Sequence, residues 1–201
     1  MSHINLHGGG RFNFSDPRAS EFTLEQIASS LAKQCRFTGH TRHPGKIYSV
    51  AQHAVMCSKI VPPEFALQAL HHDDAEFVMG DCNSPLKSLL RDYKVMETIV
   101  HCEVFHRLGL DPSLHSSVKY ADKVMLLTEQ RDVGPEPVEL EAHLVADGFQ
   151  PLDCPALEPW SIEFARHEFL MRHHELGGTR SLYTPSSIEA VFAADEMGRA
   201  A

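Results

Sequence analysis

The sequence predicts an all-α fold, a single-domain bundle of about seven helices, and two observations support this prediction. Apolar residues recur at helical spacing in several segments, which begin at capping residues or end at glycine or proline. No segment of useful length alternates between apolar and polar residues, as a half-buried strand would. With 201 residues, 43% of them hydrophobic and 22% charged, the chain is long enough for one domain with a full core.

The clearest start of a helix is a capping box, in which the hydroxyl of Thr23 caps the helix and Gln26 binds the free amide of Thr23. It predicts a helix over residues 23–35, preceded by an irregular segment over residues 1–22. The remaining helices are expected over residues 50–61, from 63 to near Gly80, and over 92–108, 113–132, 138–147, 161–176 and 187–197.

The composition excludes several classes of protein. A formal net charge of −9 disfavours binding to nucleic-acid backbones, which need a basic surface. The chain has no apolar run near ~18 residues and no secretory signal at its start, so we expect a cytoplasmic protein without membrane partners. Its five cysteines are widely spread and form no CxxC pair, which indicates reduced thiols rather than a disulfide framework.

Histidine and carboxylate residues cluster in the string HHDDAEFVMGD. Within it, His72 and Asp73 form the natural metal-binding pair, because adjacent helical residues point about 100° apart and can bracket one ion at a helix end. Glu76 lies on the same helical side as this pair. The glycine before Asp81 turns the chain, so that Asp81 can return toward the same place.

Two residues outside this string complete a ligand set. His53 lies one turn after the capping residue Ser49 in the preceding helix. Asp122 lies in an apolar helical run, YADKVMLL, where an inward carboxylate needs a compensating charge. A cation would supply that charge. Two neutral imidazoles and two carboxylates suit one divalent metal ion, for which Mn, Co, Zn, Fe and Mg are all candidates.

The order of these motifs resembles that of the HD superfamily of metal-dependent phosphohydrolases. The strings CRFTGH, YSVAQH, HHDDAEFVMGDCNSPLK and YADK are similar to the branch that contains bacterial 5'-deoxynucleotidases and phage-type dATP triphosphohydrolases. The resemblance covers residues 23–130 of an HD-type domain expected over residues 23–201, and the C-terminal helices over 138–201 match nothing.

The resemblance implies a role for each matching residue. His53, His72, Asp73 and Asp122 would ligate the metal. Glu76 would be the catalytic acid or base for the attacking water, and Asp81 would assist at the leaving oxygen.

Three further residues are candidates for substrate binding. The resemblance implies that Arg36 would contact phosphate or sugar and that Lys87 would neutralise phosphate charge. His40 lies in the same loop as Arg36 and would line the substrate pocket. The alternative for both cations is an ordinary exposed position on the surface.

The expected function is therefore hydrolysis of phosphate esters or anhydrides of nucleotides, with deoxyribonucleotides favoured. Monophosphates and triphosphates both stay open as substrates. The alternatives are an alarmone or other phosphodiester hydrolase on the same scaffold, and a non-catalytic protein that binds metal or nucleotide. An exposed apolar face on the C-terminal helices would serve a homodimer. A second histidine cluster, His167 with His174, has no further ligand set beside it.

Overall fold

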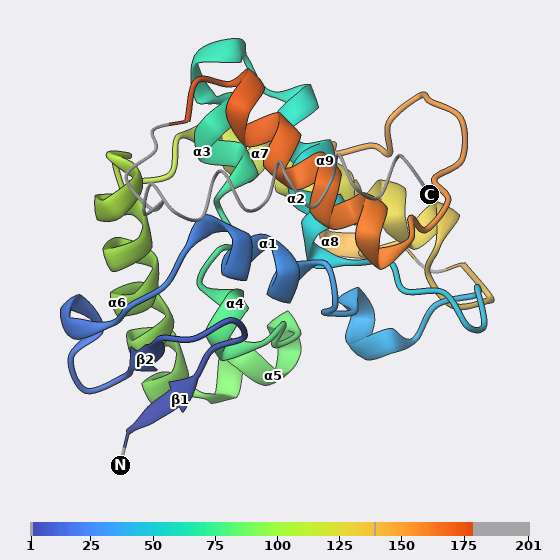
Figure 1. Cartoon of the computed structure of the whole chain (residues 1–201). Helices are drawn as coiled ribbons and strands as arrows, with labels where there is room; N and C mark the ends of the chain where they lie inside the picture. The colour runs from blue at the N-terminus through green and yellow to red at the C-terminus, as the bar shows by residue number, and fades with distance from the viewer. Residues whose placement is uncertain (1, 139, 179–201) are drawn as a thin grey trace, which may run out of the picture.

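The computed structural model describes residues 2–138 and 140–178 and shows a mostly helical chain (Figure 1). Its α-helices are α1 (Leu24–Leu31), α2 (Val50–Ile60), α3 (Ala66–Leu70), α4 (Glu76–Met79), α5 (Ser84–Leu89), α6 (Arg91–Leu108), α7 (Ser116–Asp132), α8 (Ala142–Ala146) and α9 (Ile162–Glu175). The short 3₁₀ turns are η1 (Pro17–Ala19), η2 (Arg36–Gly39) and η3 (Pro63–Phe65). The prediction of a mainly helical chain is confirmed.

The described residues form nine α-helices rather than about seven, because one expected helix is interrupted and α5 was not predicted. The helix predicted from residue 63 to near Gly80 ends at Leu70, and residues 71–75 form a turn before α4 begins. Gly80 then ends α4 in a backbone conformation with φ of 80°, which glycine adopts without strain. The helix expected over residues 187–197 lies outside the described residues.

The segment over residues 1–22 is more regular than expected. Strands β1 (His3–Asn5) and β2 (Arg11–Asn13) pair antiparallel, with Ile4 opposite Phe12. Phe12 is fully buried and packs edge-on against Phe77 of α4, with ring centroids 5.6 Å apart. Strands of three residues are too short to show a recognisable alternation, so the sequence did not reveal them. This hairpin therefore contributes a side chain to the core.

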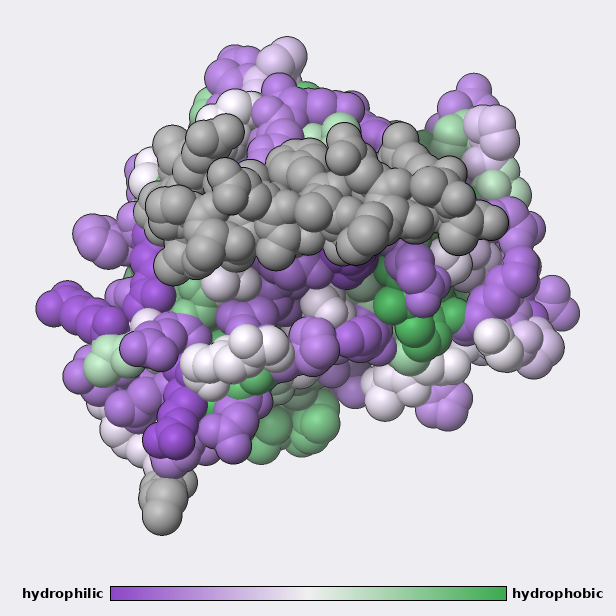
Figure 2. Space-filling view, viewed as in Figure 1, coloured by the Kyte–Doolittle hydropathy of each residue, from purple (hydrophilic) through white to green (hydrophobic). Residues whose placement is uncertain are grey.

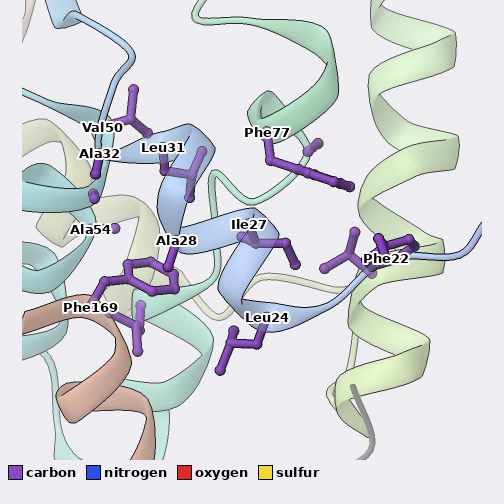
Figure 3. Packing of buried hydrophobic residues seen from close by; sticks show 14 of the residues in the cluster. Phe22, Leu24, Ile27, Ala28, Leu31, Ala32, Val50, Ala54, Phe77 and Phe169 are labelled. Atoms are coloured by element: carbon purple, nitrogen blue, oxygen red, sulfur yellow. The ribbon is translucent and has the colours of Figure 1, made fainter. Parts of the chain in front are cut away.

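Helix α1 lies at the centre of the main hydrophobic core. Its capping box forms as predicted, with Thr23 and Gln26 exchanging two hydrogen bonds. The helix ends four residues earlier than expected, at Leu31. Figure 3 shows its apolar side chains between Phe169 of α9 on one side and Phe77 on the other. The members of this core that come from α1 are Leu24, Ile27, Ala28 and Leu31.

Helix α2 connects this core to the rest of the chain, because it packs against α3, α7 and α9. Most of its residues are buried, including the polar residues Gln52, His53 and Ser58. The two glutamine hydrogen bonds tie α2 to the segment before α9, through the carbonyl of Glu158 and the amide of Trp160. A buried helix that carries polar side chains among apolar ones, and that has neighbours on several sides, is suited to hold site residues.

The two halves of helix α6 have different environments. Its buried residues all lie in its C-terminal half, from Val100 onward. Exposed apolar side chains lie on its first half and on α5, and Figure 2 shows hydrophobic residues below the centre of the view, where Figure 1 places α5. The most exposed of these side chains are Leu86, Leu89, Val95 and Ile99. Among the described residues, no helix has the length and apolar character that a membrane crossing requires.

Candidate metal centre

Three elements bring the four predicted ligands to one place. His53 lies on α2, which begins after the capping residue Ser49. His72 and Asp73 lie in the turn between α3 and α4 rather than on a helix. Asp122 lies on α7. Because α2 packs against both α3 and α7, the side chains from these elements meet.

The donor atoms of these side chains converge. The Nε2 atoms of His53 and His72 are 3.4 Å apart. Asp73 Oδ2 lies 3.6 Å from Nε2 of His53 and 3.2 Å from Nε2 of His72. Asp122 Oδ1 lies 3.3 Å and 3.9 Å from the same two atoms. Ligand atoms at about 2.0–2.2 Å from one ion are roughly 2.8–3.6 Å apart, so four of these five separations suit donors around a single cation, and only the one between Asp122 and His72 is longer.

The other nitrogen of each imidazole has its own partner. His72 Nδ1 lies 2.8 Å from the carbonyl oxygen of Ala69, to which it can only donate. His53 Nδ1 lies 2.6 Å from Oε1 of Glu129. A proton on each Nδ1 leaves each Nε2 with a lone pair that faces the other donors. This is the usual arrangement of histidines that bind metal ions.

Glu129 is a site residue that sequence reasoning missed. It is fully buried on α7 and contacts His53 on one side and Arg36 on the other. Burial alone would raise the pKa of Glu129, but the nearby Arg36 and His53 outweigh burial and lower the pKa. Glu129 follows Asp122 by seven residues, two helical turns, so helical spacing was the signal that could have revealed it.

Arg36 contacts two carboxylates at the metal centre, those of Glu129 and Asp73. Its Nε donates to Oε2 of Glu129 over 2.9 Å, and its Nη1 lies 3.8 Å from Oδ2 of Asp73. Only 12% of its side chain is exposed. Burial would lower the pKa of Arg36, but the surrounding carboxylates, Glu129 foremost, raise it. Arg36 therefore neutralises buried carboxylates, and the pocket described below does not include it.

Cys57 is a second residue that sequence reasoning passed over. It lies one turn after His53 on α2, and its Sγ is 3.4 Å from Nε2 of His53. The ligand atoms of His53, Cys57 and His72 all lie within 4.8 Å of one another, and all three residues are buried. This group could hold a metal ion. Burial raises the pKa of the Cys57 thiol to about 11, so the thiol is protonated at neutral pH in the absence of an ion.

A pocket of about 510 Å³ opens beside the ligands. His72 and Asp73 lie in its wall together with Glu76. Glu76 is 5% exposed, and its Oε2 accepts no hydrogen bond from any residue in the described ranges. Burial raises the pKa of Glu76 well above its usual range, and the negative charges of Asp73 and Asp81 raise it further. Glu76 is thus a proton-binding group beside the metal-binding atoms.

Asp81 and Asp122 have opposite shifts in pKa. Burial raises the pKa of Asp81, and Arg36 opposes that effect. Burial would also raise the pKa of Asp122, but the imidazoles of His53 and His72, whose Nε2 atoms lie 3.3 and 3.9 Å from Oδ1, hold it well below its usual range. Asp122 is accordingly ionised and available to a cation.

Lys87 and His40 have different surroundings. Lys87 lies in the wall of the same pocket and donates to Oε1 of Glu97 over 2.7 Å. Burial would lower the pKa of Lys87, but its bond to Glu97 raises it, so the ammonium group is charged. His40 follows η2, is exposed and does not lie in the pocket wall. The pocket therefore gathers Lys87 with the acidic residues and does not include His40.

Comparison with known proteins gives relatives without an assigned activity. The chain matches no established family profile. It is 46% identical over 134 residues to the uncharacterized protein YfdR of Escherichia coli strain K12, which covers 67% of this chain and 74% of that protein. It is also 30% identical over 123 residues to an uncharacterized protein of Rhodobacter capsulatus, which covers 57% of this chain and 62% of that protein.

Proposed function

The chain belongs to the family of the uncharacterized protein YfdR, and from its site we propose that it is an HD-type, metal-dependent phosphohydrolase that acts on nucleotides. The observation that carries this proposal is the combination of two oriented imidazoles, two nearby carboxylates and a buried acid, of which His72, Asp73 and Glu76 line one pocket. A binding site alone has no use for an unpaired carboxyl group such as Glu76 at that position.

The residues present fit a divalent cation. His53 and His72 offer Nε2 atoms 3.4 Å apart, and Asp73 and Asp122 each lie within 3.9 Å of both. When bound, such a cation supplies a Lewis acid that activates water and polarises a phosphoryl oxygen. The mixed nitrogen and oxygen donors suit Mn, Co, Zn or Fe, and Mg is a further candidate.

Glu76 handles the proton in this proposal. Its raised pKa makes the carboxylate of Glu76 a stronger base, which can take a proton from the attacking water and pass it on later. Because Oε2 is buried and has no partner among the described residues, it is free to face a water in the pocket. Asp81 lies near enough to Glu76 to influence its charge and would assist at the leaving oxygen.

Lys87 provides positive charge for the phosphate group. Lys87 lies in the pocket wall, and its ammonium donates to Oε1 of Glu97 over 2.7 Å. A charged donor at this position would bind phosphate oxygens and stabilise the charge that spreads over them during displacement. Arg36 acts indirectly, because its bond to Glu129 helps to hold His53.

The substrate class follows from the size of the pocket and from sequence resemblance. A volume of about 510 Å³ lies within the range typical of small-molecule sites, and it is large enough for a nucleotide. The strings CRFTGH and YSVAQH resemble those of enzymes that act on deoxyribonucleotides. We therefore favour deoxyribonucleoside phosphates, with monophosphate and triphosphate as the two forms to compare.

A substrate screen tests the proposal. The full chain is stripped of metal, reloaded with Mn, Co, Mg, Zn or Fe, and offered mono- and triphosphates of every common nucleoside. We expect release of phosphate or triphosphate from deoxyribonucleotides, faster than from ribonucleotides, and loss of activity on adding a chelator. A chain that binds metal and nucleotide but hydrolyses none of them with any metal would contradict the proposal and favour a binding protein.

A further inference from the structure

The string HHDD has an outer pair that the metal centre does not use. His71 and Asp74 flank His72 and Asp73, but both outer residues are fully buried. His71 Nδ1 lies 2.6 Å from Oδ2 of Asp74. The backbone amide of Asp74 also donates to the carbonyl of His71 over 3.1 Å. The two bonds close the turn that presents the inner pair to the pocket.

A third residue joins this pair from the far end of the chain. His173 on α9 is 1% exposed, and its Nδ1 lies 2.8 Å from Nε2 of His71. Phe169, one turn earlier on α9, packs at right angles to the ring of His71, with centroids 5.3 Å apart. Gly178 follows the helix so closely that a Cβ there would overlap the imidazole of His173. The ring of His173 is therefore held in position.

The hydrogen bonds have a consistent direction. The carboxylate of Asp74 can only accept, so the bond at 2.6 Å is donated by Nδ1 of His71. In neutral His71 the remaining nitrogen, Nε2, then accepts, and Nδ1 of His173 donates to it. Each donor in the chain of bonds fixes the tautomer and the rotation of the next ring.

We propose that Asp74, His71 and His173 form a positioning network that holds the turn of the metal centre and sets its affinity for the cation. The inference rests on the proposed metal centre, and it gives a role to the C-terminal helix, which no motif covers. The sequence singled out His167 and His174 on α9, but the residue of α9 that contacts His71 is His173. None of the three residues in the network ligates the ion.

Two amide substitutions at one position test the network. The amide of asparagine reproduces Nδ1 of a histidine, and the longer glutamine reproduces Nε2. His173→Asn can still donate to His71, whereas His173→Gln cannot do so from the same place. We expect His173→Asn to bind Co²⁺ within about threefold of the wild type and His173→Gln to bind roughly 10- to 100-fold more weakly, as for outer partners of metal ligands.

The readout is the visible absorption of bound Co²⁺, titrated without nucleotide and compared with the melting temperature of each variant. Val104→Ala on α6, a buried core residue, is the packing control, and it should lower the melting temperature while leaving the affinity for Co²⁺ unchanged. Equal affinities for the two His173 variants, or an equal loss in Val104→Ala, would overturn the network alone. Failure of the wild type to bind Co²⁺ would instead overturn the proposed function and the network with it.

A second position keeps the test decisive if His173→Gln does not fold. His71→Asn preserves a donor to Asp74 but is too short to reach His173. We expect this variant to fold and to lose affinity for Co²⁺ to a similar extent. Wild-type affinity in His71→Asn would overturn the role of His173.

Discussion

Replacing Glu76 with glutamine is expected to slow nucleotide hydrolysis by about 10²- to 10⁴-fold, the usual contribution of a positioned acid or base. The amide cannot take a proton from water. The substitution changes no ligand, so the number of bound metal ions should stay the same. The melting temperature should not fall, because the amide has nearly the same size as the carboxyl group and carries no charge that burial, Asp73 and Asp81 would disfavour.

Steady-state turnover measured beside metal content tests this expectation. Glu64→Gln makes the same chemical change on an exposed residue of η3 and serves as the control. Unchanged turnover in Glu76→Gln would remove Glu76 from the mechanism. Loss of metal together with turnover would make Glu76 part of the ligand set instead.

Replacing Glu129 with leucine is expected to lower the free energy of unfolding by about 3–5 kcal/mol, the usual cost of removing one member of a buried ion pair. Arg36 would keep its charge with Asp73 as its nearest carboxylate, at 3.8 Å instead of the 2.9 Å to Glu129. The substitution also removes the carboxylate that orients His53, so metal affinity should fall by roughly 10- to 100-fold. Denaturant titration with and without metal measures both effects.

A double replacement separates the two roles of Glu129. In Arg36→Met with Glu129→Leu, neither charge is left buried alone, and most of the stability should return. The metal affinity should not return, because His53 still lacks its partner at Nδ1. Stability of the single Glu129→Leu variant within about 1 kcal/mol of the wild type would contradict the buried-pair interpretation.

The sequence was most informative where chemistry fixes the residue type. Two imidazoles and two carboxylates predicted a ligand set, and the structure brings each carboxylate within 3.9 Å of both Nε2 atoms. The capping box at Thr23 was equally readable, because its two hydrogen bonds join residues three positions apart. Local signals of this kind need no knowledge of the tertiary fold.

The parts of the site that the sequence did not reveal depend mostly on contacts between segments far apart in the chain. Arg36 is a cation in a loop, and only packing against α7 shows that it faces Glu129, 93 residues later. His173 lies 102 residues from His71. The end of α3 at Leu70 was hidden as well, because apolar spacing continues past it while the side chains of His71 and Asp74 stabilise a turn.

The number of divalent cations bound per chain is the most direct test of the proposed centre. We expect elemental analysis to find about one ion per chain in the wild type, as for a single catalytic site. The same value is expected in Cys57→Ser, whereas Asp122→Asn should lose most of the metal. Retention of the ion in Asp122→Asn with its loss in Cys57→Ser would place it on the His53, Cys57 and His72 group. A wild-type chain that binds no ion, with His53 and His72 intact, would contradict the proposal as a whole.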